Sequence, residues 1–381
     1  MGIMDTPPLP KPPTTALAPT TRMHSLLGDI RCLIGSARGQ VARAVNVGLV
    51  MLYWQIGVRI RIEILKSRRA RYGEKIVRTL SARLVREYGS GFGHRSLFRM
   101  VRFAEVFPNS EMVSTLWTQL SWSHLREIIS LNDPLQREFY IEMCRLEHWS
   151  VRTLQKKIGG MLFERTALSR KPAELAALEL KKLREEDMLT PDLVFRDPYF
   201  LDFLGLKGAF QEKDLEAAIL REMQDFLLEL GAGFAFVARQ KRIQVGTKDY
   251  YLDLLFYQRR LRRLVAIELK LEDFKPEFKG QMEFYLRWLK KHEAAPGEKP
   301  PIGLILCAGR ESEVVELLQL DKSGIRVAQY MTDLPPSNVL ARKLRDAVRQ
   351  ARQSLTFPAS ASSFAADGRP GPVRRTWPGR R

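Results

Sequence analysis

The chain has 381 residues and a formal net charge of +19, with 45% hydrophobic and 28% charged residues. This length and composition fit a globular protein of two domains. They exclude a membrane-spanning or secreted protein, because no apolar run reaches the roughly 20 residues needed and the Pro/Thr-rich start lacks a signal-peptide centre. We therefore expect a cytoplasmic protein without a membrane partner.

The basic charge is unevenly distributed along the chain. Residues 22–170 hold 25 Lys and Arg against 12 Asp and Glu, and residues 341–381 hold 10 against 2. Residues 171–340 are nearly neutral, with 26 against 28. Basic surfaces attract polyanions, most often nucleic acid. The distribution favours a protein whose basic flanks bind the phosphates of a nucleic acid, while the nearly neutral middle keeps its carboxylates for another purpose.

Five segments follow from composition and periodicity. Both ends are rich in Pro, Gly, Ser or Thr and lack periodicity, which is typical of disorder. Helical spacing dominates the first half, and a mixed strand and helix pattern begins after a charged helix. We predict a disordered tail, a helical DNA-binding domain, a helical linker, an α/β domain and a disordered basic tail, at residues 1–22, 23–170, 171–190, 191–353 and 354–381.

A helix-turn-helix pattern lies near the start of the helical domain. One helix ends at about Tyr88, the breaker "GSGFG" follows, and a second helix begins at about His94. The exposed face of that helix would present Arg95, Arg99 and Arg102 to nucleic acid. Many structural helix pairs share this pattern, so a DNA-reading role and a structural role both remain open.

The first helix of the α/β domain carries a carboxylate on its apolar face. In "KDLEAAILREMQDFLLELG", residues 213–231, the apolar stripe extended back by one turn reaches Glu216. The other acids of this helix, including Glu229, are expected to be cap residues or solvated charges. We therefore expect the Glu216 side chain to lie on the buried face of the helix, toward the element against which the helix packs.

The stretch "YYLDLLFYQRRLRRLVAIELKLE", residues 250–272, predicts two strands joined by a basic turn. If the hairpin is symmetric, positions that sum to 521 face each other, which places Asp253 opposite Glu268, about 5 Å apart at Cβ. Like charges in such a pair destabilise a sheet unless a cation lies between them. Lys270 shares the face of Glu268, because side chains alternate along a strand.

This arrangement suits Mg²⁺, with Mn²⁺ as a substitute, because hard ions take oxygen ligands from one or two carboxylates and from substrate phosphates. Lys270 would orient or deprotonate the attacking water, or neutralise the transition state, if the metal and burial lower its pKa. A salt-bridge group on a solvated sheet face is the alternative interpretation. The basic turn is a candidate clamp for the nucleic-acid backbone through Arg260, Arg262 and Arg263.

A helix entered near Pro276 follows the hairpin. It carries Gln281 and Tyr285, which share a face because they are four residues apart. The next strand, "PIGLILCAG", is reached through this crossover helix and is expected to be parallel to its neighbour. A short helix, a strand "GIRVAQY" and a closing helix complete the predicted domain.

These residues and their order resemble the PD-(D/E)XK nuclease core, with segments in the order α-β-β-β-α-β. The strings "FAFVARQKRI", "VAIELKLEDFKPEFKGQMEFYL", "YWQIG" and "LSWSH" resemble the bacterial YhcG family, formerly domain of unknown function 1016, over about residues 25–345. One departure from the nuclease pattern is Leu252, which stands where a Pro usually precedes the first motif Asp. The matching positions are Glu216, Asp253, Glu268, Lys270, Gln281 and Tyr285.

The resemblance implies an α/β nuclease core, with a mixed sheet flanked by helices, behind an all-α domain resembling a helix-turn-helix. It implies that Asp253 and Glu268 bind the metal, that Glu216 assists the metal or its water, and that Lys270 is the motif lysine. Gln281 and Tyr285 would help to position the DNA strand and the active site.

The function expected from these observations is a Mg²⁺-dependent endonuclease of DNA processing, restriction or recombination. A nucleic-acid-binding protein that uses the nuclease fold only as a scaffold is the second reading. An RNA-cleaving enzyme is the third, because nothing in the sequence tests for recognition of a 2′-hydroxyl. A homodimer is a further expectation, because cutting both strands of a duplex needs two active sites or two visits.

Overall fold

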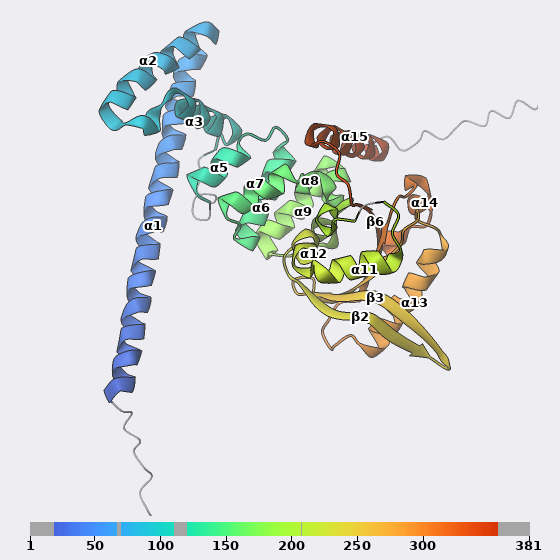
Figure 1. The fold of residues 1–381 in the computed structure, drawn as a ribbon. Coiled ribbons are helices and arrows are strands. Elements are labelled where there is room, and N and C mark those ends of the chain that lie inside the picture. The colour runs from blue at the N-terminus through green and yellow to red at the C-terminus, as the bar shows by residue number, and fades with distance from the viewer. Residues whose placement is uncertain (1–18, 67–69, 110–119, 207, 357–381) are drawn as a thin grey trace, which may run out of the picture. The chain divides into compact units, whose positions relative to one another are not determined.

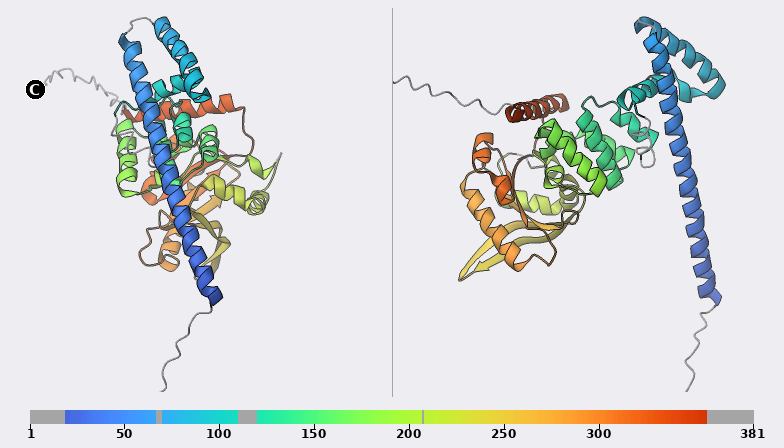
Figure 2. Two further views of the ribbon diagram at one scale, coloured as in Figure 1. Left: turned by 90° about the vertical axis from the view of Figure 1, so that its left-hand side faces the viewer. Right: turned by 180° about the vertical axis from the view of Figure 1, so that it is seen from behind.

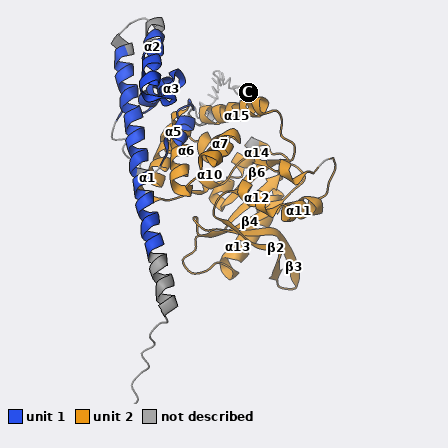
Figure 3. Cartoon of the chain, turned by 60° about the vertical axis from the view of Figure 1, so that its left-hand side comes forward, with its two compact units in different colours: residues 1–132 blue, residues 133–381 orange. Residues whose placement is uncertain are grey.

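The computed structural model describes residues 19–66, 70–109, 120–206 and 208–356. Two compact units make up the chain, residues 1–132 and 133–381 (Figure 3). Of the two tails predicted to be disordered, only residues 19–22 and 354–356 lie within the described residues, where they belong to helices. The predicted helical domain therefore extends over unit 1 and the first helices of unit 2.

Every regular element described in unit 1 is a helix. The helix α1 is long and continuous (Figures 1 and 2). α3 packs closely on it at Gly57, where an added Cβ would lie 1.9 Å from the Met100 carbonyl oxygen. Ile60, Val77 and Leu97 are buried in this core. The bounds are α1 (Pro19–Lys66), α2 (Ala70–Tyr88), the 3₁₀ turn η1 (Ser90–Phe92), α3 (His94–Val106) and α5 (Trp122–Ile128).

Part of α1, Ile30–Glu63, has the length and apolar composition of a helix that could cross a membrane. No membrane-spanning segment was expected from the sequence. Length and composition are weak evidence here, because the core helix of a globular domain meets the same criteria. Only 12% of the apolar window of this helix is buried in the structure. Within unit 1, Val50 is fully buried, and the Trp54 indole Nε1 donates to the Phe107 carbonyl oxygen at 2.7 Å.

Unit 2 begins with short helices. The Asp133 side chain caps the first one by accepting the Leu135 N–H at 2.9 Å. Two of these helices are divided at Gly160 and Met161, because Gly160 ends the first of the two and Met161 takes a positive φ of 52°. The expected linker packs against α6 through its apolar face. The bounds are α6 (Pro134–Glu147), α7 (Val151–Gly159), α8 (Leu162–Arg165), η2 (Ala167–Arg170), α9 (Ala173–Glu186) and α10 (Pro191–Val194).

The rest of unit 2 is built on a six-stranded sheet in the order β1-β6-β5-β4-β3-β2. β2, β3 and β4 are antiparallel neighbours, and β4, β5, β6 and β1 are parallel neighbours. The parallel pairing predicted for the strand after the crossover helix is confirmed, and β1 was not predicted. The strands are β1 (Tyr199–Phe200), β2 (Phe234–Val245), β3 (Lys248–Gln258), β4 (Arg263–Leu269), β5 (Ile302–Cys307) and β6 (Ile325–Met331).

Helices cover both faces of this sheet, with α11 and α12 on one side and α13 on the other (Figures 1 and 2). The order α11, β2, β3, β4, α13, β5 confirms the predicted α-β-β-β-α-β core. The helix predicted over 213–231 is two helices, because Glu222 leaves helical geometry with φ −102° and ψ 33°. The remaining bounds are η3 (Asp202–Leu204), α11 (Glu212–Arg221), α12 (Met223–Leu230), α13 (Glu277–His292), α14 (Ser312–Leu317), η4 (Leu320–Ser323) and α15 (Ser337–Thr356).

Glu229 in α12 corrects one expectation. It is not solvated: its carboxylate forms ion pairs with Arg165 from α8 and with Arg196, at 3.1 Å in the second case. It also accepts the Phe200 backbone N–H at 3.0 Å. Both arginines are 4% exposed, so this carboxylate joins the helical layer to the edge of the sheet.

Candidate active site

The register of β3 and β4 brings two carboxylates together. The paired positions run from Gln258↔Arg263 to Leu254↔Ile267, and each pair sums to 521, as predicted. One step beyond the last pair lie Asp253 and Glu268. Here side chains replace backbone pairing: the Asp253 N–H donates to Glu268 Oε1 at 3.4 Å, and Asp253 Oδ2 accepts the Leu269 N–H at 2.9 Å.

Burial makes this pair of carboxylates electrostatically costly. Glu268 is only 3% exposed, and Asp253 is partly buried. Desolvation raises the pKa of Asp253, and desolvation together with the nearby Asp253 charge raises the pKa of Glu268 to about 8. A cation bound by both carboxylates would offset the desolvation of each charge and the repulsion between them.

Lys270 lies beside the pair, as predicted. Its Nζ is 3.3 Å from Glu268 Oε2 and 5.5 Å from the centre of the Phe278 ring. Burial lowers the pKa of Lys270, but the surrounding carboxylates, Glu268 first, outweigh burial and raise it overall. With these carboxylates around it, Lys270 therefore stays protonated at neutral pH.

Glu216 arrives from α11 and is 6% exposed, so its predicted burial is confirmed. It bonds to two neighbouring residues of β2 that the sequence analysis missed. Arg239 Nε donates to Glu216 Oε1 at 2.5 Å, and Gln240 Nε2 donates to Glu216 Oε2 at 2.9 Å. Gln240 Nε2 also donates to Asp253 Oδ1 at 3.1 Å, so one amide links the two carboxylates.

A usable signal for Gln240 was present in the sequence. Positions of β2 and β3 from Ala238↔Leu255 to Val245↔Lys248 sum to 493, which places residue 240 opposite Asp253. The symmetry of the first hairpin therefore places Gln240 opposite Asp253, just as the symmetry of the second places Glu268 there.

Gln281 and Tyr285 on α13 contact each other and anchor that helix to β3. Gln281 Nε2 donates to Tyr285 Oη at 2.9 Å, and Tyr285 Oη donates to the Tyr251 carbonyl oxygen at 3.2 Å. Tyr251 is two residues from Asp253. Tyr285 is 2% exposed, and burial raises the pKa of its phenol. The structure thus brings all six predicted nuclease-motif residues into one region.

The basic turn lies at the other end of the same two strands. Gln258 is five residue steps from Asp253 along β3, which is roughly 17 Å of extended chain. Arg260 Nη2 donates to the Leu146 carbonyl oxygen at 2.8 Å, Arg262 has a positive φ of 53°, and Arg263 is partly buried. These three arginines are therefore not gathered with the carboxylates.

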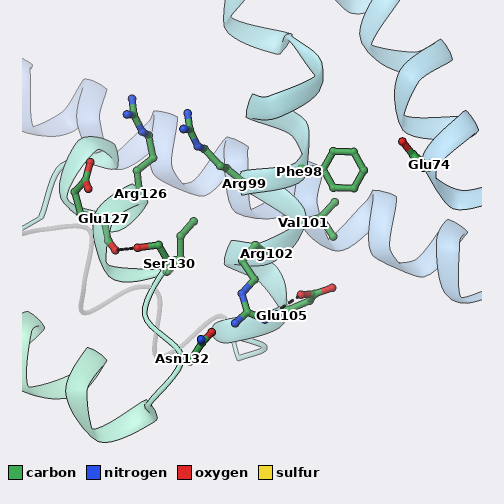
Figure 4. Close-up of a pocket in the computed structure, with 11 residues that line it drawn as sticks. Glu74, Phe98, Arg99, Val101, Arg102, Glu105, Arg126, Glu127, Ser130 and Asn132 are labelled. Carbon is green, nitrogen blue, oxygen red and sulfur yellow. Dashed lines mark hydrogen bonds and ion pairs between the residues drawn. The ribbon is translucent and has the colours of Figure 1, made fainter. Parts of the chain in front are cut away.

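The arginines predicted on the face of α3 are all exposed. Arg99 and Arg102 line a cleft of about 930 Å³ in unit 1 together with Arg126 from α5 (Figure 4). Arg102 Nη1 is 3.4 Å from Glu105 Oε2. Because Glu74, Glu105 and Glu127 also line the cleft, it is mixed in charge rather than uniformly basic. Arg95, the third exposed arginine of α3, does not line this cleft.

Among the residues that the structure describes, no group of three or more His, Cys, Asp and Glu side chains has the arrangement of a metal site. The candidate metal-binding set is therefore the pair Asp253 and Glu268. Glu216 was expected to assist the metal or its water, but in this structure both of its oxygens accept hydrogen bonds from β2.

Two family models and one curated protein match the chain. The DUF1016 N-terminal domain matches residues 29–165, and the YhcG PDDEXK nuclease domain matches residues 192–348. The putative nuclease YhcG of Escherichia coli K12 is 33% identical over 343 residues, which cover 82% of this chain and 91% of that protein.

Solved structures match at a lower level. A repair endonuclease from Pyrococcus abyssi shares 21% identity over 34% of this chain and 50% of its own, with a TM-score of 0.23. A complex titled EndoMS-dsDNA2 shares 19% identity over 34% and 49%, with a TM-score of 0.25. TM-scores this low do not establish a common fold. By the extent of the family and protein matches, however, the chain belongs to the YhcG family and carries its PDDEXK nuclease domain.

Proposed function

We propose that this protein is a divalent-metal-dependent DNA endonuclease whose active site is formed by β3, β4, α11 and α13. One observation supports the proposal above all others: Asp253 and Glu268 face each other at the end of a strand pair, with the Lys270 ammonium 3.3 Å from Glu268. A buried pair of like charges has no stabilising role of its own, so its natural explanation is a bound cation.

The chemistry of the donor set fits Mg²⁺, with Mn²⁺ as a substitute. Asp253 and Glu268 supply hard oxygen ligands, and hydrogen bonds from Gln240 and from the Leu269 N–H orient Asp253. Two carboxylates leave room for phosphate oxygens and water, which Mg²⁺ prefers to a closed protein cage. When bound, such an ion stabilises charge on the phosphate and lowers the pKa of coordinated water.

The remaining residues have distinct roles in this proposal. Lys270, protonated at neutral pH, donates hydrogen bonds to the scissile phosphate and neutralises charge in the transition state. Glu216 orders the β2 side of the site through Arg239 and Gln240. Gln281 and Tyr285 hold α13 against β3 and present the exposed Gln281 amide to the nucleic-acid strand.

DNA is the proposed substrate, in processing, restriction or recombination. The support is the basic surplus in residues 22–170 and the exposed arginines of α3, which we assign to the DNA backbone together with Arg126. The proposed place of action is the bacterial cytoplasm, at the nucleoid. Arg260, Arg262 and Arg263 remain candidate contacts for a longer duplex, since they lie away from the carboxylates.

A homodimer is part of the proposal. Cleavage of both strands needs two active sites or two visits by one site, and α1 offers a surface for a second copy. Several large apolar side chains on α1 are well exposed in the structure, among them Leu33, Val41 and Val45 at 69%, 64% and 56%. Light scattering of the purified protein tests this state, and a monomer at all concentrations would contradict it.

The test of function is incubation of the full-length protein with supercoiled, branched and single-stranded DNA, and with RNA, in Mg²⁺, Mn²⁺ or EDTA. We expect Mg²⁺-dependent cleavage of DNA that Asp253→Ala and Glu268→Ala abolish. Full activity in EDTA, or in either variant, would overturn the mechanism. Binding without cleavage in every metal would instead favour a protein that uses the nuclease fold only as a scaffold. Cleavage of RNA alone would favour an RNA-cleaving enzyme.

A further inference from the structure

Gln240 has an unusual backbone for a residue inside a strand. Its φ is 44°, in the left-handed region that side chains other than glycine rarely adopt. The residues on either side pair normally with β3, as Arg239↔Leu254 and Lys241↔Leu252. The ladder therefore holds Gln240 in a strained conformation, and such strain tends to persist where it serves a function.

The side chain of Gln240 shows what this conformation achieves. Its Nε2 donates to Glu216 Oε2 at 2.9 Å and to Asp253 Oδ1 at 3.1 Å. A primary amide has two N–H donors, so both are used, each on a different carboxylate. The two acceptors come from α11 and β3, and Gln240 itself lies on β2.

Asp253 is consequently fixed from two directions. Its Oδ2 accepts the Leu269 N–H at 2.9 Å, and its Oδ1 accepts the Gln240 amide. A carboxylate with a donor on each oxygen keeps one orientation and still has lone pairs for a cation. Outer partners of this kind orient metal ligands, and their loss typically weakens metal binding or activity about 10- to 100-fold.

We propose that Gln240 is a positioning residue of the nuclease site, which orients Asp253 for the divalent cation and fixes it relative to Glu216. This inference rests on the proposed function. A purely structural role fits less well, because Glu216 already has the Arg239 guanidinium at 2.5 Å and because glycine would adopt the backbone of residue 240 without strain.

The decisive variant is Gln240→Gly, which removes the amide and relieves the backbone strain. Gln240→Asn keeps the amide and tolerates the left-handed conformation, but it is one methylene shorter. Gln244→Gly is the matched control: it lies on the same strand, is exposed, and its amide contacts only the Gly246 carbonyl oxygen, at 3.5 Å, among its side-chain contacts in the described structure. Each full-length variant is assayed for Tm in EDTA, Mn²⁺ affinity by calorimetry, and kcat and KM on DNA.

We expect Gln240→Gly to keep or raise the Tm while Mn²⁺ binding weakens at least about tenfold and kcat falls, with KM nearly unchanged. Gln240→Asn should recover part of the Mn²⁺ affinity, and Gln244→Gly should bind Mn²⁺ like the wild type. Wild-type Mn²⁺ affinity in Gln240→Gly would overturn the inference. A Gln240→Gly variant that loses Mn²⁺ affinity together with Tm would also overturn it, because the loss would then reflect a destabilised fold.

Failure of the proposed function gives a different result. If the wild type binds Mn²⁺ but cleaves no nucleic acid, the nuclease proposal fails, and the Mn²⁺ affinities of the variants still decide the role of Gln240. If the wild type does not bind Mn²⁺, both proposals are overturned.

Discussion

Glu268 is the site residue whose charge is most opposed by its surroundings. It is 3% exposed, and desolvation together with the Asp253 charge raises its pKa to about 8, whereas an unfolded Glu has a pKa of about 4.3. Between these values the folded state keeps a proton that the unfolded state has lost. The stability linked to this proton is present at low pH and is lost as pH rises through about 8.

We therefore expect Glu268→Gln to be more stable than the wild type in EDTA at about pH 9, by a few degrees in Tm, to keep only part of this advantage at about pH 6, and to lose it near about pH 4, below the unfolded pKa. Glutamine removes both the desolvated charge and its repulsion with Asp253. The measurement is thermal unfolding across this range. Glu272→Gln, which changes an exposed carboxylate just past β4, is the control. An advantage that does not grow with pH would show that the raised pKa is wrong.

At the scale of single residues, the positions that depend only on local backbone geometry could be predicted from the sequence. Alternation along β4 and the symmetry of the hairpin placed Asp253, Glu268 and Lys270 correctly, because both follow from backbone geometry alone. The solvation expected for Glu229 was wrong, because its partners Arg165 and Arg196 come from distant segments that helical periodicity does not register.

At the scale of elements, long periodic segments were predictable and interruptions were not. The start of α3 matches the sequence reading, because the glycine-containing turn before it marks where the helix begins. The break at Glu222 was missed, since no Gly or Pro marks it. The two-residue strand β1 was missed as well: it pairs with β6, more than a hundred residues later. Such features depend on tertiary contacts rather than on local propensity.

The attachment of the helical layer to the sheet gives a prediction at this scale. Glu229→Ala would leave Arg165 and Arg196 buried without their shared carboxylate and the Phe200 N–H without its acceptor. Breaking a buried pair in this way costs about 3–5 kcal/mol, which lowers Tm by at least about 6 °C. Thermal unfolding by circular dichroism measures the loss. Glu222→Ala, at the N-terminal end of the same helix α12, should change Tm by no more than about 2 °C. An equal loss in that variant would refute the assignment.

For the whole molecule, the basic surplus and the carboxylates of the candidate site lie in different parts of the chain. The carboxylates of the candidate site lie in the nearly neutral middle of the chain, whereas unit 1 carries the exposed arginines of α3. If unit 1 binds the phosphate backbone, its contribution depends on released counterions and therefore on salt. Substitutions in unit 1 should then weaken DNA binding without changing the rate of cleavage at saturating DNA.

The variant that tests this division is Arg95→Ala with Arg99→Ala. Each lost phosphate contact lowers the slope of log affinity against log salt by about 0.9, so we expect the slope to fall by nearly 2, with kcat unchanged. The matched control is Lys181→Ala with Lys182→Ala, which removes the same charge from an exposed face of α9 in unit 2. Fluorescence anisotropy between about 50 and 200 mM salt measures both slopes. Equal slopes in the two variants would mean that overall charge, and not the face of α3, attracts the DNA.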